Sequence, residues 1–212
     1  MWTVLGWIAL GGFAAWLAVT FGWHTWRLYR RTGDTGVRMA GGRSGVQRAA
    51  MLLFAVALLA GIAAPVAALL GFPTPTGPLA LPVAGGIIVA ATIVATPLTQ
   101  AAMRDSWRIG VESDEHTALV TSGPFRLARN PMFTLSAAVS LGLALLVPNV
   151  IALLGVTATI AAVQLQVRGV EEPHLLAAHG RTYRDYAAVT GRFVPGLGRL
   201  TAPAPAGGRR SG

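Results

Sequence analysis

The chain contains no cysteine and no lysine, and charged residues of either sign are few. Without cysteine there is no disulfide, no thiolate metal site and no cysteine nucleophile, although a thiol substrate is not excluded. Only 12% of the 212 residues are charged, against about 25% in a typical soluble domain, whereas 53% are hydrophobic. Most of the chain is therefore expected to lie in an apolar medium.

Charge is missing altogether from three long stretches, 1–23, 49–103 and 130–167. An α-helix crosses a bilayer core with about 20 apolar residues, so the first stretch predicts one span and the others two each. No basic segment precedes the first stretch, which favours a retained span over a signal peptide. We predict an all-α integral membrane protein with about five transmembrane helices, at roughly 2–24, 49–70 and 79–102 and in a hairpin over 131–168.

The arginines indicate an orientation for these spans. All 17 lie in 27–48, 104–129 or 168–210, and the turns expected at 71–78 and at Pro148–Asn149 contain none. The positive-inside rule places the three arginine-bearing segments in the cytoplasm and the N-terminus outside. The net charge of +9 then reflects orientation in the membrane rather than binding to nucleic acid. The composition suggests a bacterial cytoplasmic membrane.

Three regions are expected along the chain. Residues 1–103 form an N-terminal region of three spans with a basic cytoplasmic loop at 27–48. Residues 104–199 form a core with a cytoplasmic motif, the hairpin 131–168 and an amphipathic helix at 173–190. Residues 200–212 are rich in Pro, Gly and Ala and are expected to be disordered.

Two polar segments flank the hairpin, and each has an ordinary structural interpretation. In the first, Arg129 suits the lipid interface, Asn130 suits an N-cap and Pro131 suits the first helical position. In the second, Pro173 disfavours α geometry at the preceding Glu172, and carboxylates at a helix N-terminus favour the dipole. The alternative is that both segments meet at the membrane surface and form a site. No phosphate-binding loop, Ser-His-Asp set or metal site is evident.

The spacing of the two segments resembles the isoprenylcysteine carboxyl methyltransferase and phospholipid methyltransferase superfamily. The residues that match the first block of the family pattern are Leu119, Val120, Gly123, Phe125, Arg129, Pro131 and Phe133. The residues that match the second block are Glu171, Glu172, Leu175, Gly180, Tyr183, Tyr186, Arg192 and Pro195. The chain departs from the pattern at Asn130, where the family often has His, and at His179, where it usually has Phe.

This resemblance implies binding of S-adenosylmethionine at the cytoplasmic face of the membrane. The residues implied at the cofactor are Leu119, Val120, Gly123, Phe125, Arg129, Asn130, Phe133, Glu172, His179 and Tyr183. Aromatic rings in this set are candidates for cation–π contact with the sulfonium, and Glu171 or Glu172 for holding an ammonium or ribose. The catalytic candidates are Arg168, which would orient a carboxylate acceptor, and Glu171, which would serve an amine acceptor.

The sequence does not identify the methyl acceptor. A lipid or lipid-like carboxylate, amine or thiol would each fit the residues present, entering laterally from the bilayer. Two other functions are kept as alternatives. One is an NADPH-dependent membrane reductase of related C-terminal architecture, and the other is a non-catalytic scaffold or small transporter. Transport is disfavoured because no charged residue lies inside a predicted span. The sequence does not indicate an oligomeric state.

Overall fold

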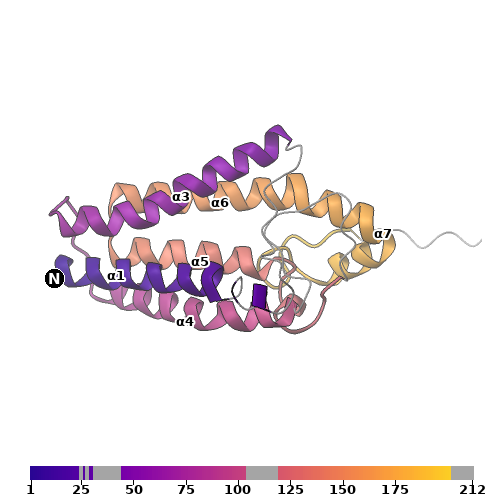
Figure 1. Ribbon diagram of the computed structural model, residues 1–212, viewed down its shortest axis with the longest axis horizontal. Helices are drawn as coiled ribbons and strands as arrows, with labels where there is room; N and C mark the ends of the chain where they lie inside the picture. Colours follow the sequence, from indigo (N-terminus) through magenta and orange to yellow (C-terminus); the bar gives the residue numbers. More distant parts are fainter. Residues whose placement is uncertain (24–25, 27–28, 31–43, 104–118, 202–212) are drawn as a thin grey trace, which may run out of the picture.

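The computed structural model describes residues 1–23, 26, 29–30, 44–103 and 119–201, which form a bundle of helices (Figure 1). The elements are α1 (Trp2–Leu17), the π-helix η1 (Ala18–Trp23), α3 (Gly45–Leu69), α4 (Ala80–Met103), the 3₁₀-helix η3 (Gly123–Arg126), α5 (Pro131–Leu146), α6 (Val150–Gln166), the π-helix η4 (Val167–Glu171) and α7 (Glu172–Val189). Among these residues the extended structure is an isolated parallel bridge between Ala128 and Gly191. The predicted basic loop 27–48 and tail 200–212 lie mostly outside the described residues.

Four continuous helical stretches are long and apolar enough to cross a membrane. They are Trp2–Gly22, Gly45–Leu69, Ala80–Met103 and Val150–Val189, the last of which joins α6, η4 and α7. Only 22% to 44% of the residues in their apolar windows are buried inside the protein, so large apolar side chains face outward, as lipid allows. The prediction of an all-α integral membrane protein is confirmed, although α5 is shorter than the other spans, at 16 residues.

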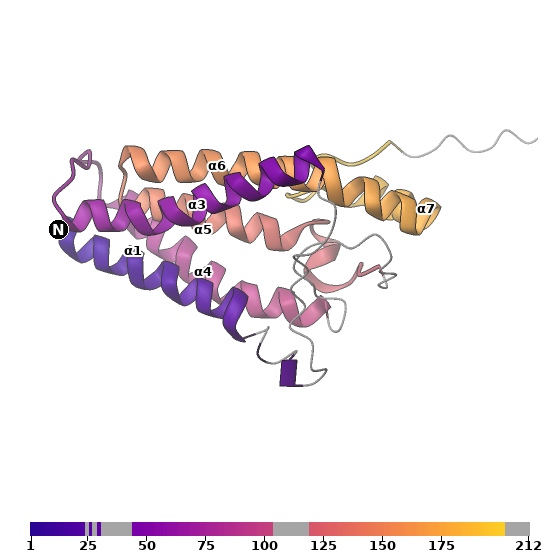
Figure 2. The same cartoon turned by 45° about the horizontal axis from the view of Figure 1, so that its top comes forward.

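Small residues allow the helices to approach closely. α3 lies along α6, α4 lies along α5, and α1 packs against α3 and α4 (Figure 2). Gly85 of α4 faces the backbone of α5, where a Cβ would lie 2.6 Å from the carbonyl oxygen of Gly142. Such glycine contacts are a common basis of helix association in lipid, where apolar side chains gain little from leaving the hydrocarbon. The boundary predicted at residue 103, between the N-terminal region and the core, remains a prediction. Helices from both regions pack together in this bundle.

Asn149 explains how the hairpin of α5 and α6 turns. Its Oδ1 accepts a hydrogen bond from the backbone N–H of Ala152 at 3.0 Å and caps α6. Its Nδ2 donates to the carbonyl oxygen of Ala64 in α3 at 3.0 Å. The side chain therefore satisfies two backbone groups at a turn buried within the protein, where an unpaired one would be costly.

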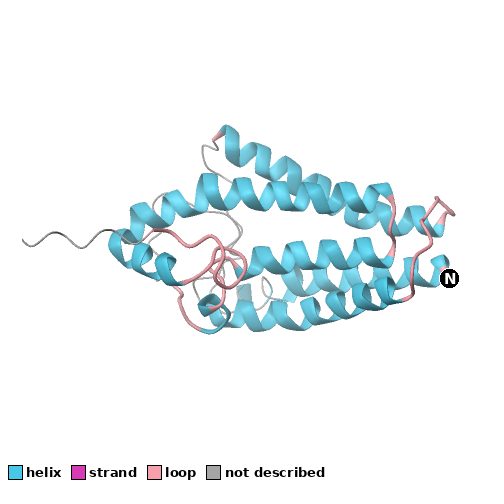
Figure 3. Cartoon of the chain, turned by 180° about the vertical axis from the view of Figure 1, so that it is seen from behind, coloured by secondary structure: helices cyan, strands magenta, loops and turns pink. Residues whose placement is uncertain are grey.

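The helices alternate in direction, so the two polar segments meet at one end of the bundle. The turns that join α3 to α4 and α5 to α6 lie at the end that carries the N-terminus (Figure 1). The loops before α5 and after α7 lie at the other end, where Figure 3 shows them side by side. The bundle thus brings residues 119–131 next to residues 168–200.

Candidate functional site

An ion pair between Arg129 and Glu172 joins the two polar segments. Arg129 Nη2 donates to Glu172 Oε1 at 2.6 Å, and the exposed fractions of the two side chains are 1% and 9%. Arg129 precedes α5 and Glu172 begins α7, so the pair fixes the far end of the hairpin. A charge-assisted hydrogen bond of this length is strong, and burial makes the loss of either partner costly.

Arg192 is a second cation on the same carboxylate. Its Nε donates to Glu172 Oε1 at 2.8 Å and its Nη2 to Glu172 Oε2 at 2.9 Å. Burial raises the pKa of Glu172, but the hydrogen bonds and charges of Arg192 and Arg129 outweigh burial and leave that pKa below its usual value. The carboxylate is therefore ionised at neutral pH, and the three groups together hold one net positive charge. We call Arg129, Glu172 and Arg192 the arginine–glutamate cluster.

The remaining donors of Arg129 hold the C-terminal segment in place. Nη1 donates to the carbonyl oxygens of Ala187 and Thr190, and Nη2 donates to that of Gly198. Of the five N–H donors of the guanidinium, only Nε–H is buried without a hydrogen-bond partner among the described residues. Arg129 therefore acts mainly as an internal tie, with little capacity left for a ligand.

Backbone hydrogen bonds extend this connection. The N–H of Arg129 donates to the carbonyl of Gly191, and the N–H of Asn130 donates to that of Arg192. Asn130 Nδ2 donates to the same Arg192 carbonyl, and Thr134 Oγ1 donates to that of Phe193. A Cβ at Gly191 would lie 2.0 Å from the Val194 carbonyl oxygen, so the close approach requires glycine. Residues 190–200 are thus part of the site.

Glu171 lies beside the cluster but has no cationic partner among the described residues. Its Oε1 accepts one hydrogen bond, from Gln166 Nε2 at 3.3 Å. Burial raises the pKa of Glu171 to about 7, and the Gln166 bond opposes that rise. The apolar run that contains α6 ends before Arg168 in η4. Glu171 therefore lies just beyond the apolar residues of this span. It is a half-buried carboxylate that, within the described part of the chain, pairs with Gln166 alone.

The π-helical turn of η4 explains this placement. In η4 the backbone N–H of Glu172 bonds to the carbonyl of Val167, five residues back. Because a π-turn brings residues five apart above one another, Gln166 and Glu171 can pair. The wider turn also accommodates Pro173, whose ring would clash with a normal helical turn. The expectation that Pro173 keeps Glu172 out of α geometry is wrong, since Glu172 has φ −62° and ψ −44°.

A kink at Gly180 sets the position of the tyrosines. Gly180 has φ +50° and ψ −118°, a conformation that side-chain-bearing residues avoid. α7 is therefore two helical pieces, and the amphipathic helix predicted at 173–190 is interrupted at Gly180. Tyr183 is buried beside the cluster, and its hydroxyl has no hydrogen-bond partner among the described residues. Burial, followed by the charge of Glu172, raises the pKa of Tyr183 to about 12, so the hydroxyl remains a donor.

The other predicted residues take varied positions. Phe125 is buried and its carbonyl accepts a hydrogen bond from the Tyr186 hydroxyl, while Leu119 and Val120 are half-buried before it. Phe133 stacks on Phe54 of α3 with ring centroids 6.0 Å apart. Gly123, at φ +59°, and Arg168 are exposed, and His179 is half-buried.

Two structural interpretations made from the sequence are wrong in detail. Arg129 does not lie at the lipid interface, because internal acceptors bury it. Asn130 occupies the N-cap position of α5, but its side chain makes no capping hydrogen bond and instead donates to Arg192. Pro131 does take the first turn of α5, as predicted.

The model of the phospholipid methyltransferase family matches residues 79–182. This part of the chain is similar to the phospholipid methyltransferase family. The matched stretch runs from the start of α4 into α7 and contains both partners of the buried Arg129–Glu172 pair. The resemblance predicted from the sequence is confirmed, and the family implies a membrane methyltransferase. No curated protein sequence matches the chain.

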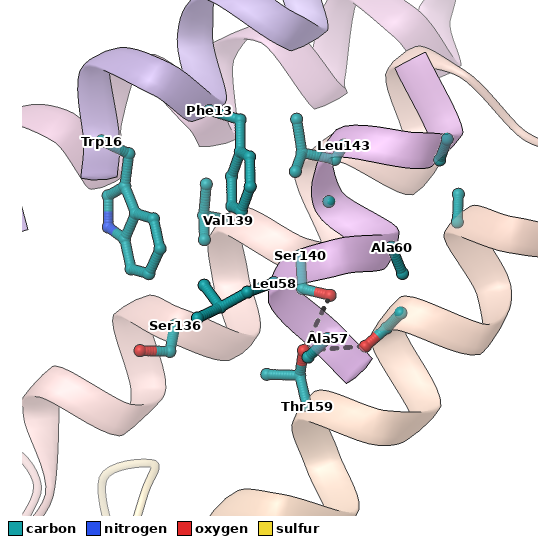
Figure 4. A pocket seen from close by; sticks show the side chains of 14 residues that line it. Phe13, Trp16, Ala57, Leu58, Ala60, Ser136, Val139, Ser140, Leu143 and Thr159 are labelled. Atoms are coloured by element: carbon teal, nitrogen blue, oxygen red, sulfur yellow. Dashed lines mark hydrogen bonds between the residues drawn. The ribbon is translucent and has the colours of Figure 1, made fainter. Parts of the chain in front are cut away.

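A small pocket lies inside the bundle, away from the arginine–glutamate cluster. Residues from α1, α3, α5 and α6 line about 40 Å³ of space (Figure 4). Most of the lining is apolar, but Ser136, Ser140 and Thr159 contribute hydroxyls, and Thr159 Oγ1 donates to Ser140 Oγ at 3.2 Å. Ser136 of the pocket lies in α5, which begins two residues after Arg129 of the arginine–glutamate cluster.

Sequence reasoning missed several residues of the site. Arg192 matches the family pattern, but only the structure shows that it is the bidentate partner of Glu172. No sequence signal marks Gln166, because an α-helix would not place it beside Glu171. Gly191 was also missed, since its requirement arises from a loop packed upon itself. Among the described residues no group of three or more His, Asp or Glu could hold a metal ion.

Proposed function

We propose that the protein transfers a methyl group from S-adenosylmethionine to a lipid or lipid-like acceptor at the cytoplasmic face of the membrane. One observation carries this proposal. The arginine–glutamate cluster, whose charges bind one another, lies beside the carboxylate of Glu171, which has no cationic partner among the described residues, at one end of the bundle. The family match supports methyl transfer. The arginine distribution supports the cytoplasmic face.

The groups left open around the cluster fit the chemistry of such a cofactor. Glu171 has a free carboxylate that would accept a ribose hydroxyl or pair with an ammonium group. The net positive charge of the cluster would favour a carboxylate nearby, and Arg192 Nη1 is not used in the bonds to Glu172. The Tyr183 hydroxyl and the Arg129 Nε–H are buried donors without a partner among the described residues.

The predicted site residues divide into two roles in this proposal. Leu119, Val120, Gly123, Phe125 and Asn130 would form the wall on one side of the cofactor. Phe133, His179 and Tyr183 would form the wall on the other side. Arg129 and Glu172 would position these walls by tying the two segments together, and Glu171 would contact the cofactor directly.

Positioning and exclusion of water would provide most of the catalysis. The bound cofactor would supply a methyl group already activated on a sulfonium. The chain's own contribution would be to hold the acceptor in line with that methyl group, and such alignment is worth many orders of magnitude in rate. The buried setting at the membrane boundary would strengthen attraction between opposite charges, since the local dielectric constant is low.

The nature of the acceptor decides which residue would act on it. An amine would need Glu171 as counter-ion or base, and a pKa of about 7 suits that task. A carboxylate or thiolate would instead need a cation such as Arg168, which is exposed and free to turn toward the bilayer. The apolar part of the acceptor would lie between helices, on the side of the pocket lined by α5.

Binding of the cofactor product tests this proposal. The purified full chain in detergent is melted with S-adenosylhomocysteine, with NADPH or with neither. We expect S-adenosylhomocysteine to raise the melting temperature, because a ligand that binds only the folded state stabilises it. Glu171→Gln should weaken binding about tenfold or more, whereas Asp185→Asn on the exposed side of α7 should not.

Each other outcome contradicts part of the proposal. A shift with NADPH alone would favour the reductase, and no shift with either ligand would favour the scaffold. Equal affinity for S-adenosylhomocysteine in the wild type and in Glu171→Gln would remove Glu171 from the site.

A further inference from the structure

We propose that the turn Val194–Leu197 is embedded in the lipid leaflet at the site's end of the bundle. The N–H of Leu197 donates to the carbonyl of Val194 at 3.2 Å and closes a four-residue turn. Pro195 follows the first residue and Gly196, at φ +79°, comes next, which are the features of a type II β-turn. This proposal concerns how the protein contacts the bilayer and stands independently of the methyl transfer.

The turn presents apolar side chains outward. Val194 is 49% exposed and Leu197 is 66% exposed. Leu127, next to the bridge that joins Ala128 to Gly191, is 63% exposed. Loops that face water are usually polar, and apolar side chains gathered on one irregular segment indicate a surface that is covered.

The length of α5 indicates that lipid covers this surface. Its 16 residues span about 24 Å, whereas a bilayer core is about 30 Å thick. The neighbouring α3 and α4, with 25 and 24 residues, are long enough to span the whole core. The hydrocarbon core therefore extends beyond at least one end of α5. At the C-terminal end of α5 the chain turns directly into α6, at Pro148 and Asn149, so we place the extra hydrocarbon at the N-terminal end.

A hydrogen bond fixes the turn at the depth of the first turn of α5. Thr134 Oγ1 in α5 donates to the carbonyl of Phe193 at 2.7 Å. Phe193 directly precedes Val194, so the turn lies beside the beginning of the short span rather than out in the solvent. It occupies the level where the core would extend past α5.

Most backbone carbonyls of Gly191–Gly198 are hydrogen-bonded within the protein, as a medium without water requires. Six carbonyls within Gly191–Gly198 accept hydrogen bonds from the protein: those of Gly191, Arg192, Phe193, Val194, Leu197 and Gly198. Irregular backbone at membrane depth must satisfy its polar groups internally. A loop that faced water would not need this degree of internal pairing.

Arg199 supplies the charge expected at the boundary. Its Nη2 lies 3.8 Å from the position of a Cβ on Gly196, so the guanidinium is close to the turn. Apolar side chains with an adjacent arginine are typical of segments that insert into the headgroup region, where the cation meets lipid phosphate. We therefore assign the partner of this surface as bilayer lipid rather than a second protein.

A nitroxide label at position 197 tests the assignment. The chain has no cysteine, so Leu197→Cys can be labelled at one position only. In vesicles, the label's collisions with oxygen, which concentrates in lipid, are compared with its collisions with a water-soluble nickel chelate. We expect oxygen to dominate at position 197, as at the lipid-facing control Leu153→Cys in α6, which is 61% exposed. Nickel should dominate at the exposed α7 control Arg184→Cys.

Two results would overturn the assignment. A label at position 197 that matches position 184 would place the turn in water. A label shielded from both reagents would place it against protein. Val194→Cys, on the other side of the turn, repeats the measurement with an independent variant, and both substitutions replace exposed side chains, so the fold is not at risk.

Discussion

At the scale of single residues, Arg129 accounts for much of the site's geometry. It satisfies three backbone carbonyls and one carboxylate that lie 43 to 69 residues further along the chain. Neither an ammonium nor a neutral side chain can reproduce this planar set of donors. The identity of the residue, and not only its charge, should therefore matter.

Replacing Arg129 with lysine should destabilise the protein by about 2 kcal/mol or more, since buried carbonyls would lose their donors. The expected readout is a melting temperature several degrees lower in detergent. Arg126→Lys, on the exposed end of η3, is the control and should melt like the wild type. Equal melting of Arg129→Lys and the control would show that the ties to the C-terminal segment contribute little.

Glu171 should make stability depend on pH in a defined direction. Its folded pKa of about 7 lies above the unfolded value of 4.5, so the folded state holds the proton more tightly. Stability is therefore lost as pH rises from about 4.5 to 7. Glu171→Gln removes that loss, so the variant should match the wild type near pH 4.5 and melt higher than it at pH 8. A difference in melting temperature that stays constant with pH would contradict the shifted pKa.

At the scale of helices, the sequence predicted where spans lie but not how they bend. Gaps in charge indicate the positions of α1, α3, α4, α5 and α6, because an ionised side chain is costly in hydrocarbon. The irregular turns depend on contacts between distant segments. Neither the π-turn at η4 nor the kink at Gly180 follows from periodicity. For the same reason the sequence identified the segments of the site but not the closed cluster or the role of Arg192.

The kink at Gly180 can be tested without changing any contact. Among the described residues no atom lies within 4 Å of where a Cβ would be, so Gly180→Ala introduces mainly backbone strain. We expect a loss of about 1–3 kcal/mol, and a weaker affinity for S-adenosylhomocysteine if Tyr183 moves. Gly11→Ala in α1, also without a neighbour within 4 Å, should leave the melting temperature unchanged or slightly raised. The account of the kink fails if both variants melt alike.

The packing of α4 on α5 gives a second pair of matched substitutions. At Gly85 a Cβ would lie 2.6 Å from a backbone oxygen, whereas at Gly86 the nearest atom, Leu146 Cδ2, would be 3.9 Å away. Gly85→Ala should force the helices apart and cost about 1–3 kcal/mol. Gly86→Ala should be neutral. Melting temperatures of the two variants check this directly, and equal values would show that the helix contact tolerates a methyl group.

At the scale of the whole molecule, the bundle brings two polar segments to one membrane boundary. The beginning of α5, the arginine–glutamate cluster and Glu171 all lie at that end. The family match, at residues 79–182, runs from α4 into α7 and includes Arg129, Glu171 and Glu172.

Transfer of a labelled methyl group tests this account most directly. The purified chain is reconstituted in vesicles of bacterial lipid extract with S-adenosylmethionine labelled in its methyl group, and the organic phase is counted. The account predicts label in the lipid fraction with the wild type and a loss of at least tenfold with Glu171→Gln. Absence of label from every lipophilic product with the folded wild-type protein would contradict it.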